Sequence, residues 1–136
     1  MNKAATELLI SLHPQLYGPL GFFACGDGWY SILDALGTAI ESIVALEKRK
    51  IEFKEGETVK FGDLIAISDI KEKYGTLRVY FSSSIAGAML DDLVDLAEEV
   101  SQYTCEYCGE AGKIRDVSGW RTCMCDKCHT FREKGK

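Results

Sequence analysis

Two pairs of cysteines constrain this chain of 136 residues more than any other feature of its sequence. The pairs are Cys105 with Cys108 and Cys125 with Cys128, in a C-x2-C-x16-C-x2-C arrangement. Each C-x-x-C brings two thiolates together on a tight turn, and two pairs complete the tetrahedron that zinc prefers. Gly109, directly after the first pair, favours a turn there. The spacing therefore predicts a structural zinc site with these four cysteines as ligands.

Two neighbouring residues leave the choice of ligands open. Cys123 could take the place of Cys125, and His129 could take the place of Cys128. We prefer the paired set because either exchange breaks the C-x-x-C symmetry. A closed shell of four thiolates leaves no coordination position for water, which favours a structural role for the metal over a catalytic one.

The distribution of cysteines also bears on the cellular compartment. Five of the six cysteines lie within residues 105–128, which favours a metal site over a disulfide framework. Glu7 interrupts the short apolar stretch at the N-terminal end, and no small-residue cleavage site follows it. No run approaches the ~18 apolar residues of a membrane span. We therefore expect a reducing, cytoplasmic location.

The net charge of −5 is unevenly distributed. Residues 1–104 carry 9 Lys and Arg against 16 Asp and Glu, whereas residues 105–136 carry 7 against 5. Four thiolates around one divalent ion add about −2, which brings the zinc-bound segment close to neutral. Generic nucleic-acid binders have a large basic face, so this balance weighs against non-specific binding of DNA or RNA.

Hydrophobic periodicity predicts the remaining elements. We expect a short helix over residues 3–12, a loop over 17–28, a helix from Trp29 to about Lys48 capped by Asp27, and a hairpin over 51–63 that turns near Gly56. An amphipathic helix over residues 85–103 would place seven apolar side chains inward: Ala86, Met89, Leu90, Leu93, Leu96, Ala97 and Val100. The predicted fold class is α+β, with two longer helices packed on a small antiparallel sheet. Residues 1–104 would form the core domain and residues 105–136 a zinc-ribbon-like element.

The sheet is predicted from two strands that meet at Tyr74 and Gly75. A two-residue turn there pairs Lys73 with Thr76, Glu72 with Leu77, Lys71 with Arg78, and Ile70 with Val79. The core face would then carry Leu64, Ala66, Ile70, Leu77, Val79 and Phe81. The opposite face would carry Lys71, Lys73 and Arg78, with Asp69 and Tyr80 beside them. Like charges opposite one another are destabilising, so this basic face is a candidate anion site, unless its lysines only protect a sheet edge.

A glycine-rich loop, Cys25-Gly26-Asp27-Gly28-Trp29, precedes the first long helix. Backbone N–H groups and the helix dipole at such a place suit a ligand, and Asp27 would contact a ribose hydroxyl, a base or a cation. The alternative is a capped turn with Cys25 and Trp29 in the core. Cys25 as a nucleophile would need a base. The complete set of candidate ligand-binding residues is Asp27, Trp29, Lys71, Lys73, Arg78 and Tyr80.

Four segments taken together resemble a family of small, uncharacterised proteins of phages and prophages. They are CGDGW (25–29), KEKYGTLRVY (71–80), CEYCG (105–109) and GWRTCMCDKC (119–128). The chain departs from the family pattern at Tyr74, where phenylalanine is expected, and at residues 123–124, where Thr-Leu is expected. The resemblance implies a phage-encoded accessory protein in the bacterial cytoplasm, and such genes often encode inhibitors of host defence or host regulators.

Two functions from different classes fit these observations. The first is a non-catalytic protein that binds an anionic ligand, such as a nucleotide signal, or an acidic host protein. The second is a zinc-ribbon regulator that binds nucleic acid, with Trp120 stacking and five cations on phosphates: Lys113, Arg115, Arg121, Lys127 and Arg132. The charge balance and an expected shortage of exposed aromatic side chains favour the first. An enzyme acting on a nucleotide is a third possibility, but no acid–base pair is evident.

Overall fold

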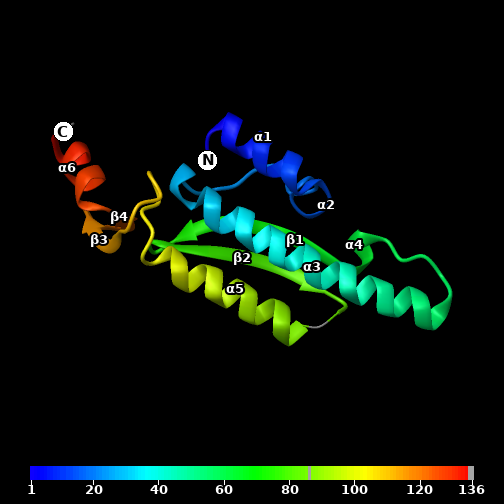
Figure 1. Cartoon of the computed structure of the whole chain (residues 1–136). Helices are drawn as coiled ribbons and strands as arrows, with labels where there is room; N and C mark the ends of the chain where they lie inside the picture. Colours follow the sequence, from blue (N-terminus) through cyan, green and yellow to red (C-terminus); the bar gives the residue numbers. More distant parts are fainter. Residues whose placement is uncertain (86, 135–136) are drawn as a thin grey trace.

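The structure, a computed structural model, describes residues 1–85 and 87–134 and has the predicted α+β architecture (Figure 1). Its helices are α1 (Lys3–Leu12), α2 (Pro14–Tyr17), the 3-10 helix η1 (Asp27–Trp29), α3 (Tyr30–Glu55), α4 (Phe61–Leu64), α5 (Gly87–Ser101) and α6 (Asp126–Lys134). Its strands are β1 (Ile65–Lys73), β2 (Thr76–Ser83), β3 (Lys113–Val117) and β4 (Trp120–Met124). Two antiparallel hairpins result, β1–β2 and β3–β4.

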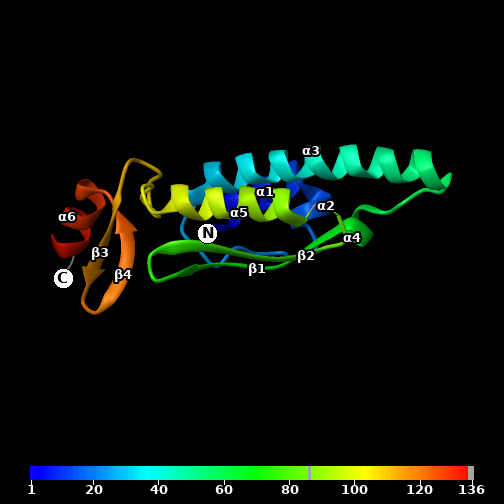
Figure 2. The same ribbon diagram turned by 90° about the horizontal axis from the view of Figure 1, so that it is seen from below.

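The β1–β2 hairpin forms one layer and the helices α1, α2, α3 and α5 form the other, as Figure 2 shows. Apolar side chains from both layers fill the space between them, among them Leu9, Leu33, Ile40, Ile70, Leu77 and Leu90. The β3–β4 hairpin and α6 lie together beyond one end of these layers, on the side of the β1–β2 turn (Figure 1). This end of the molecule holds the predicted metal site.

Helix α3 is longer than predicted. It continues past Lys48 to Glu55 and ends at Gly56, which adopts a left-handed conformation with φ 72° and donates its N–H to the carbonyl of Glu52. Glycine is the usual residue at such a helix end because it has no Cβ to clash. The predicted hairpin around Gly56 is therefore wrong, and the glycine ends a helix.

The register of the β1–β2 hairpin is the predicted one, with all four predicted pairs present. Tyr74 and Gly75 both have positive φ, 55° and 82°, as a tight two-residue hairpin turn requires. A bulge between Ile67 and Asp69 changes which residues of β1 face the core. Ala66 is exposed, contrary to prediction, while Ile65 and Ile67 are buried.

Both edges of this two-stranded sheet are covered. On the β1 edge, Ala24 donates to the carbonyl of Ile70 and accepts from Glu72, each at 3.0 Å. On the β2 edge, the N–H of Leu77 donates to Ser101 Oγ at 2.9 Å, and that of Val79 donates to Glu98 Oε2 at 3.1 Å. Since unpaired strand edges invite association with other chains, these contacts protect a sheet that has only two strands.

Helix α5 buries a narrower face than predicted. Leu90, Val94, Ala97 and Ser101 are buried. The predicted inward residues Met89, Leu96 and Val100 are exposed, and that part of the prediction is wrong; Ala86 lies outside the described residues. The apolar stripe of this helix is wider than the contact it makes with β2 and α3, so part of it faces solvent.

The stretch Asp27–Glu55 is long and apolar enough to cross a membrane by length and composition alone, with a mean hydropathy of 1.3 in its most apolar part. In the structure this helix packs against α1 and α5. It also presents Asp34 and Glu41 to His13. These contacts are those of a helix that packs within the fold.

A buried histidine joins the end of α1 to α3. His13 Nε2 lies 2.7 Å from Asp34 Oδ1, and its Nδ1 is hydrogen-bonded to Glu41 Oε1. Gly37 makes room for the ring, since a Cβ there would lie 3.0 Å from it. Burial alone would lower the pKa of His13, but hydrogen bonds to the two carboxylates outweigh this effect and raise the pKa above 6.5.

We expect the contribution of His13 to stability to depend on pH. Because the folded-state pKa is raised, the contribution is fully present below the unfolded pKa of about 6.5 and is lost as pH rises through the folded pKa. His13→Gln should cost about 1–2 kcal/mol of unfolding free energy at about pH 6 and less at about pH 9, since the carboxylates are partly exposed. Urea unfolding of both proteins across this range measures the difference. A cost independent of pH would contradict the assigned charge.

Candidate metal centre

The structure brings the four predicted cysteines together. The Sγ atoms of Cys105, Cys108, Cys125 and Cys128 all lie within 4.8 Å of one another, and those of Cys108 and Cys125 are 3.6 Å apart. A tetrahedral metal with sulfur ligands at about 2.3 Å separates the sulfurs by about 3.8 Å. The cluster therefore has the donor set and the dimensions of a four-thiolate metal site.

The first pair lies on a tight turn that follows α5. The N–H of Gly109 donates to the carbonyl of Cys105 at 3.0 Å, and Gly109 has a positive φ of 84°. Burial alone would raise the pKa of the Cys105 thiol, but hydrogen bonds from backbone N–H groups, including those of Cys125 and Cys108, lower it to about 7. The turn therefore favours the thiolate form that binds metals.

The second pair lies at the start of α6 and not on a second isolated turn. β4 ends at Met124, and the N–H of His129 donates to the carbonyl of Cys125 at 3.1 Å in the first turn of the helix. The N–H of Cys128 points at Cys125 Sγ, 3.3 Å away. A helix N-terminus stabilises negative charge, but burial and hydrogen bonds with the three other cysteines raise the pKa of the Cys128 thiol to about 12. The C-terminal element is thus a turn, the β3–β4 hairpin and a helix around one cysteine cluster.

The two alternative ligands lie outside the cluster. Cys123 is fully buried, and its Sγ donates to the carbonyl of Gln102 at 3.3 Å. Burial raises the pKa of the Cys123 thiol to about 11. His129 Nε2 lies 3.2 Å from Glu133 Oε1 on the next turn of α6. These contacts support the paired set of ligands over the exchanged ones.

The glycine-rich loop contacts the metal site directly. The N–H of Gly26 donates to Glu106 Oε2 at 2.8 Å, and that of Gly28 donates to the carbonyl of Glu106 at 2.7 Å. A Cβ on Gly28 would lie 2.0 Å from the carbonyl oxygen of Cys105. The glycines are therefore needed because the loop backbone packs on the backbone of the first cysteine turn. Their packing against the turn that carries Cys105 was not predicted.

Trp29 and Asp27 each have a structural partner. Trp29 is fully buried and its Nε1 donates to the carbonyl of Thr104 at 2.9 Å, so this side chain lies in the core, as the alternative interpretation of the loop expected. Asp27 accepts hydrogen bonds from the backbone and side chain of Asn2 and does not cap α3, contrary to prediction. Burial raises the pKa of the Cys25 thiol to about 12, which disfavours the thiolate form that a nucleophile needs.

The β1–β2 turn also reaches the C-terminal element. A Cβ on Gly75 would lie 3.3 Å from the backbone nitrogen of Thr122 in β4. Two of the motifs noted in the sequence, at residues 25–29 and 71–80, thus pack against the segment that carries the cysteines. Residues far apart in the sequence form one structural unit around the candidate metal site.

The basic face of the β1–β2 hairpin carries Lys71, Lys73, Arg78 and Tyr80, as predicted, but its cations have local partners. Lys71 Nζ lies 3.6 Å from Asp69 Oδ2 and 5.4 Å from the Tyr80 ring. Lys73 lies over the Tyr74 ring at 5.6 Å. Arg78 Nη1 lies 4.0 Å from Glu98 Oε1. Arg78 also lines a pocket with three carboxylates, those of Asp95, Glu98 and Glu99. The negative charge of these carboxylates disfavours the binding of an anion beside Arg78.

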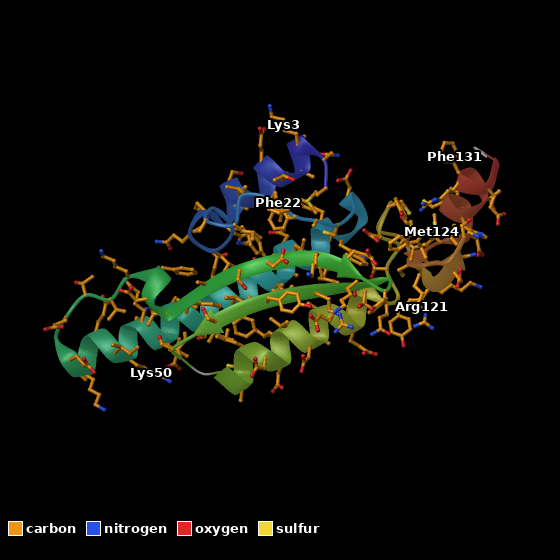
Figure 3. All side chains as sticks on the ribbon, turned by 180° about the vertical axis from the view of Figure 1, so that it is seen from behind. Lys3, Phe22, Lys50, Arg121, Met124 and Phe131 are labelled. Atoms are coloured by element: carbon orange, nitrogen blue, oxygen red, sulfur yellow. The ribbon has the colours of Figure 1, made fainter. Side chains whose placement is uncertain are left out.

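A different surface combines aromatic and cationic side chains. A groove of about 720 Å³ is lined by Tyr107, Met124, Lys127, Cys128, Phe131 and Arg132, and we call it the α6 groove. Phe131 is 81% exposed, and Arg132 donates to the hydroxyl of Tyr107 at 2.8 Å. Phe131 and Met124 are labelled in Figure 3 at this end of the molecule. Trp120 is exposed as well, so the expected shortage of exposed aromatic side chains is wrong.

Comparison with models of protein families, with curated proteins and with solved structures finds no match to this chain. The assignment of function therefore depends on the chemistry of the cysteine cluster and the α6 groove. The resemblance to phage proteins stays a prediction.

Proposed function

We propose that this protein is a non-catalytic, zinc-containing accessory protein that binds a nucleotide, free or within a single strand, in the α6 groove. The observation that carries the proposal is the exposed ring of Phe131 beside the side chains of Lys127 and Arg132. The resemblance to phage proteins adds that it acts in the cytoplasm of an infected bacterium, where a nucleotide signal or a nucleic acid of the host would be the target.

Zinc is the proposed metal because four thiolates in a tetrahedron form its usual structural site. Such a shell is closed, so the metal would hold the turn at Cys105 and the start of α6 in place. Tyr107 lies between the first two ligands, and Phe131 and Arg132 follow the last one on α6. Metal binding would thereby fix the two sides of the α6 groove.

The side chains of the α6 groove suit the two parts of a nucleotide. Lys127 and Phe131 are four residues apart on α6 and so lie on the same helix face. A base stacked on Phe131 would gain about 1–3 kcal/mol, and a phosphate beside it would meet Lys127 and Arg132. The guanidinium of Arg132, held 5.8 Å from the Tyr107 ring, is already ordered, which lowers the entropy lost on binding.

The composition of the α6 groove supports binding without catalysis. Within the part of the chain that the structure describes, the residues lining it carry no carboxylate or imidazole, the side chains that most often act as general acid and base. Its one thiol, on Cys128, belongs to the cysteine cluster. We infer that the α6 groove holds a ligand and does not transform it.

Removing the ring of Phe131 should weaken nucleotide binding. We expect Phe131→Ala to reduce affinity for a fluorescent single strand of about 16 nucleotides by about 5- to 150-fold, measured by anisotropy at fixed salt. Phe22→Ala is the matched control, since Phe22 is an exposed aromatic residue on the loop before η1. Competition by mononucleotides and cyclic dinucleotides distinguishes a free nucleotide from a strand as the ligand.

The same assay separates the α6 groove from the basic hairpin face. The basic hairpin face stays a second candidate for the ligand site because of one unpaired donor. Arg78 Nε is buried and has no hydrogen-bond partner among the described residues. Its ligand would be an anion or an acidic host protein. A loss of affinity in the double variant Lys71→Ala, Arg78→Ala, with Phe131→Ala unaffected, would move the site to the hairpin. Lack of binding to any nucleotide by the wild-type protein would reject the proposed function.

A further inference from the structure

A second groove lies beside the α6 groove on the same helix. It has a volume of about 440 Å³ and is lined by Asp126, Lys127, Thr130 and Phe131. We call it the Thr130 groove. Lys127 and Phe131 line the α6 groove as well. Both volumes lie within the range of about 300–1,000 Å³ that small-molecule sites have, so each groove has room for one planar base.

The two grooves lie on opposite sides of one row of side chains. Residues four apart form a row along a helix, and each successive residue is turned by about 100°. Lys127 and Phe131 form such a row, with Thr130 on one side of it and Arg132 on the other. Phe131 lies at the outer edge of the molecule (Figure 3) and borders both grooves with a side chain that is 81% exposed. Both faces of its ring are therefore open to a planar ligand.

The charges around this row favour an anion at Lys127. The carboxylate of Asp126 is paired with the guanidinium of Arg115, which balances the negative charge in the Thr130 groove. Glu133 Oε1 lies 3.2 Å from His129 Nε2. Lys127 is exposed and has no ion pair in the described ranges of the chain. Since Lys127 lines both grooves, its ammonium group can reach a phosphate that lies between them.

We propose that Phe131 inserts between two adjacent bases of the ligand. The α6 groove holds one base, the Thr130 groove holds the next, and Lys127 contacts the phosphate that joins them. This inference rests on the proposed function and names its ligand as two bases joined through a phosphate, in a single strand or in a cyclic dinucleotide. Each face of the ring gains a stacked base. Separating the bases costs least where they are unpaired, which disfavours a duplex.

The number of bases bound is tested with the full-length wild-type protein. We expect a linear dinucleotide to bind about 5- to 150-fold more tightly than the mononucleotide with the same base, because a second base stacks. Tighter binding of a cyclic than of a linear dinucleotide would identify a free signal as the ligand, and the reverse order a strand. Equal affinity for mononucleotide and dinucleotides would overturn the inference and leave the proposed function intact. Lack of binding to any of them would overturn both.

Filling the Thr130 groove should remove only the second base. Thr130 is exposed, so Thr130→Leu should keep the fold, which its melting temperature checks. We expect its affinity for the dinucleotide to fall about 5- to 150-fold, to the level of the mononucleotide, whose own affinity should change little. Thr38→Leu is the matched control because Thr38 is an exposed threonine on α3. Equal losses for both ligands would show a single common site and overturn the inference.

A dinucleotide of 2-aminopurine reports the insertion itself. Neighbouring bases stacked about 3.4 Å apart couple their electronic transitions, which gives a paired circular dichroism signal. The ring of Phe131 between them roughly doubles this distance, so binding to the wild-type protein should abolish the signal. Phe131→Ala, at concentrations that saturate it, should leave the signal in place. A signal kept in the wild-type complex would show that both bases lie on one side of the ring and overturn the inference.

Discussion

Alanine in place of Gly28 should separate the glycine-rich loop from the metal site. The added Cβ would lie 2.0 Å from the carbonyl oxygen of Cys105 and 2.6 Å from the carbonyl carbon of Glu106. Both atoms belong to backbone, so no side-chain rotation relieves the clash. Moving the loop also breaks the hydrogen bond from the N–H of Gly28 to Glu106. We expect a loss of about 2–5 kcal/mol of unfolding free energy.

The change at Gly28 is measured by chemical unfolding together with metal retention during dialysis. Gly62→Ala is the matched control, since Gly62 lies in helix α4 with nothing within 4 Å of an added Cβ. That substitution should be neutral or stabilise the protein by up to about 1 kcal/mol. If Gly28→Ala were as stable as Gly62→Ala and kept its metal equally well, the packing of the loop on the cysteine turn would be wrong.

Serine in place of Cys125 should remove the metal, whereas serine in place of Cys123 should not. Cys125 is one of the four clustered sulfurs, and Cys123 bonds the carbonyl of Gln102 instead. Structural zinc sites contribute about 10–16 kcal/mol of binding free energy, so losing one thiolate should lower affinity by orders of magnitude. Elemental analysis of the purified proteins should give one zinc per chain for wild type and Cys123→Ser. Full zinc in Cys125→Ser would reject this set of ligands.

Chelation of the metal should loosen the C-terminal element before the rest. The buried face of α3 and the β1–β2 hairpin belong to a core that lies almost entirely before Cys105, so far-UV circular dichroism should keep most of its helical signal. The fluorescence of Trp29 should change, because its indole donates to the carbonyl of Thr104 next to the first ligand. One cooperative collapse of the whole chain would show instead that the core depends on the metal.

The features that the sequence predicted correctly depend on local geometry. The cysteine spacing predicted the cluster because each C-x-x-C pair is brought together by a turn of a few residues. Tyr74 and Gly75 predicted the hairpin register, since a two-residue turn determines every pair along the strands. Gly56 shows the limit of such signals, because the same residue can turn a hairpin or end a helix.

The errors concern contacts between distant segments. The loop at residues 25–29 has the glycines of a ligand-binding loop, and only the position of Cys105 and Glu106 shows that these glycines allow close backbone packing. Trp29 is buried and Phe131 exposed, although both are aromatic residues next to charged or glycine-rich segments. Exposure depends on what packs over a side chain, and the sequence around it does not contain that information.

The sequence by itself determined the α+β class, the β1–β2 register and the identity of the four clustered cysteines. Each follows from bonding rules that act over a turn or a strand pair. The tertiary structure decided that the motifs at residues 25–29 and 71–80 support the C-terminal element, and it revealed the α6 groove. These features arise where helices and turns meet through space, and their geometry is set by the packing of the whole chain.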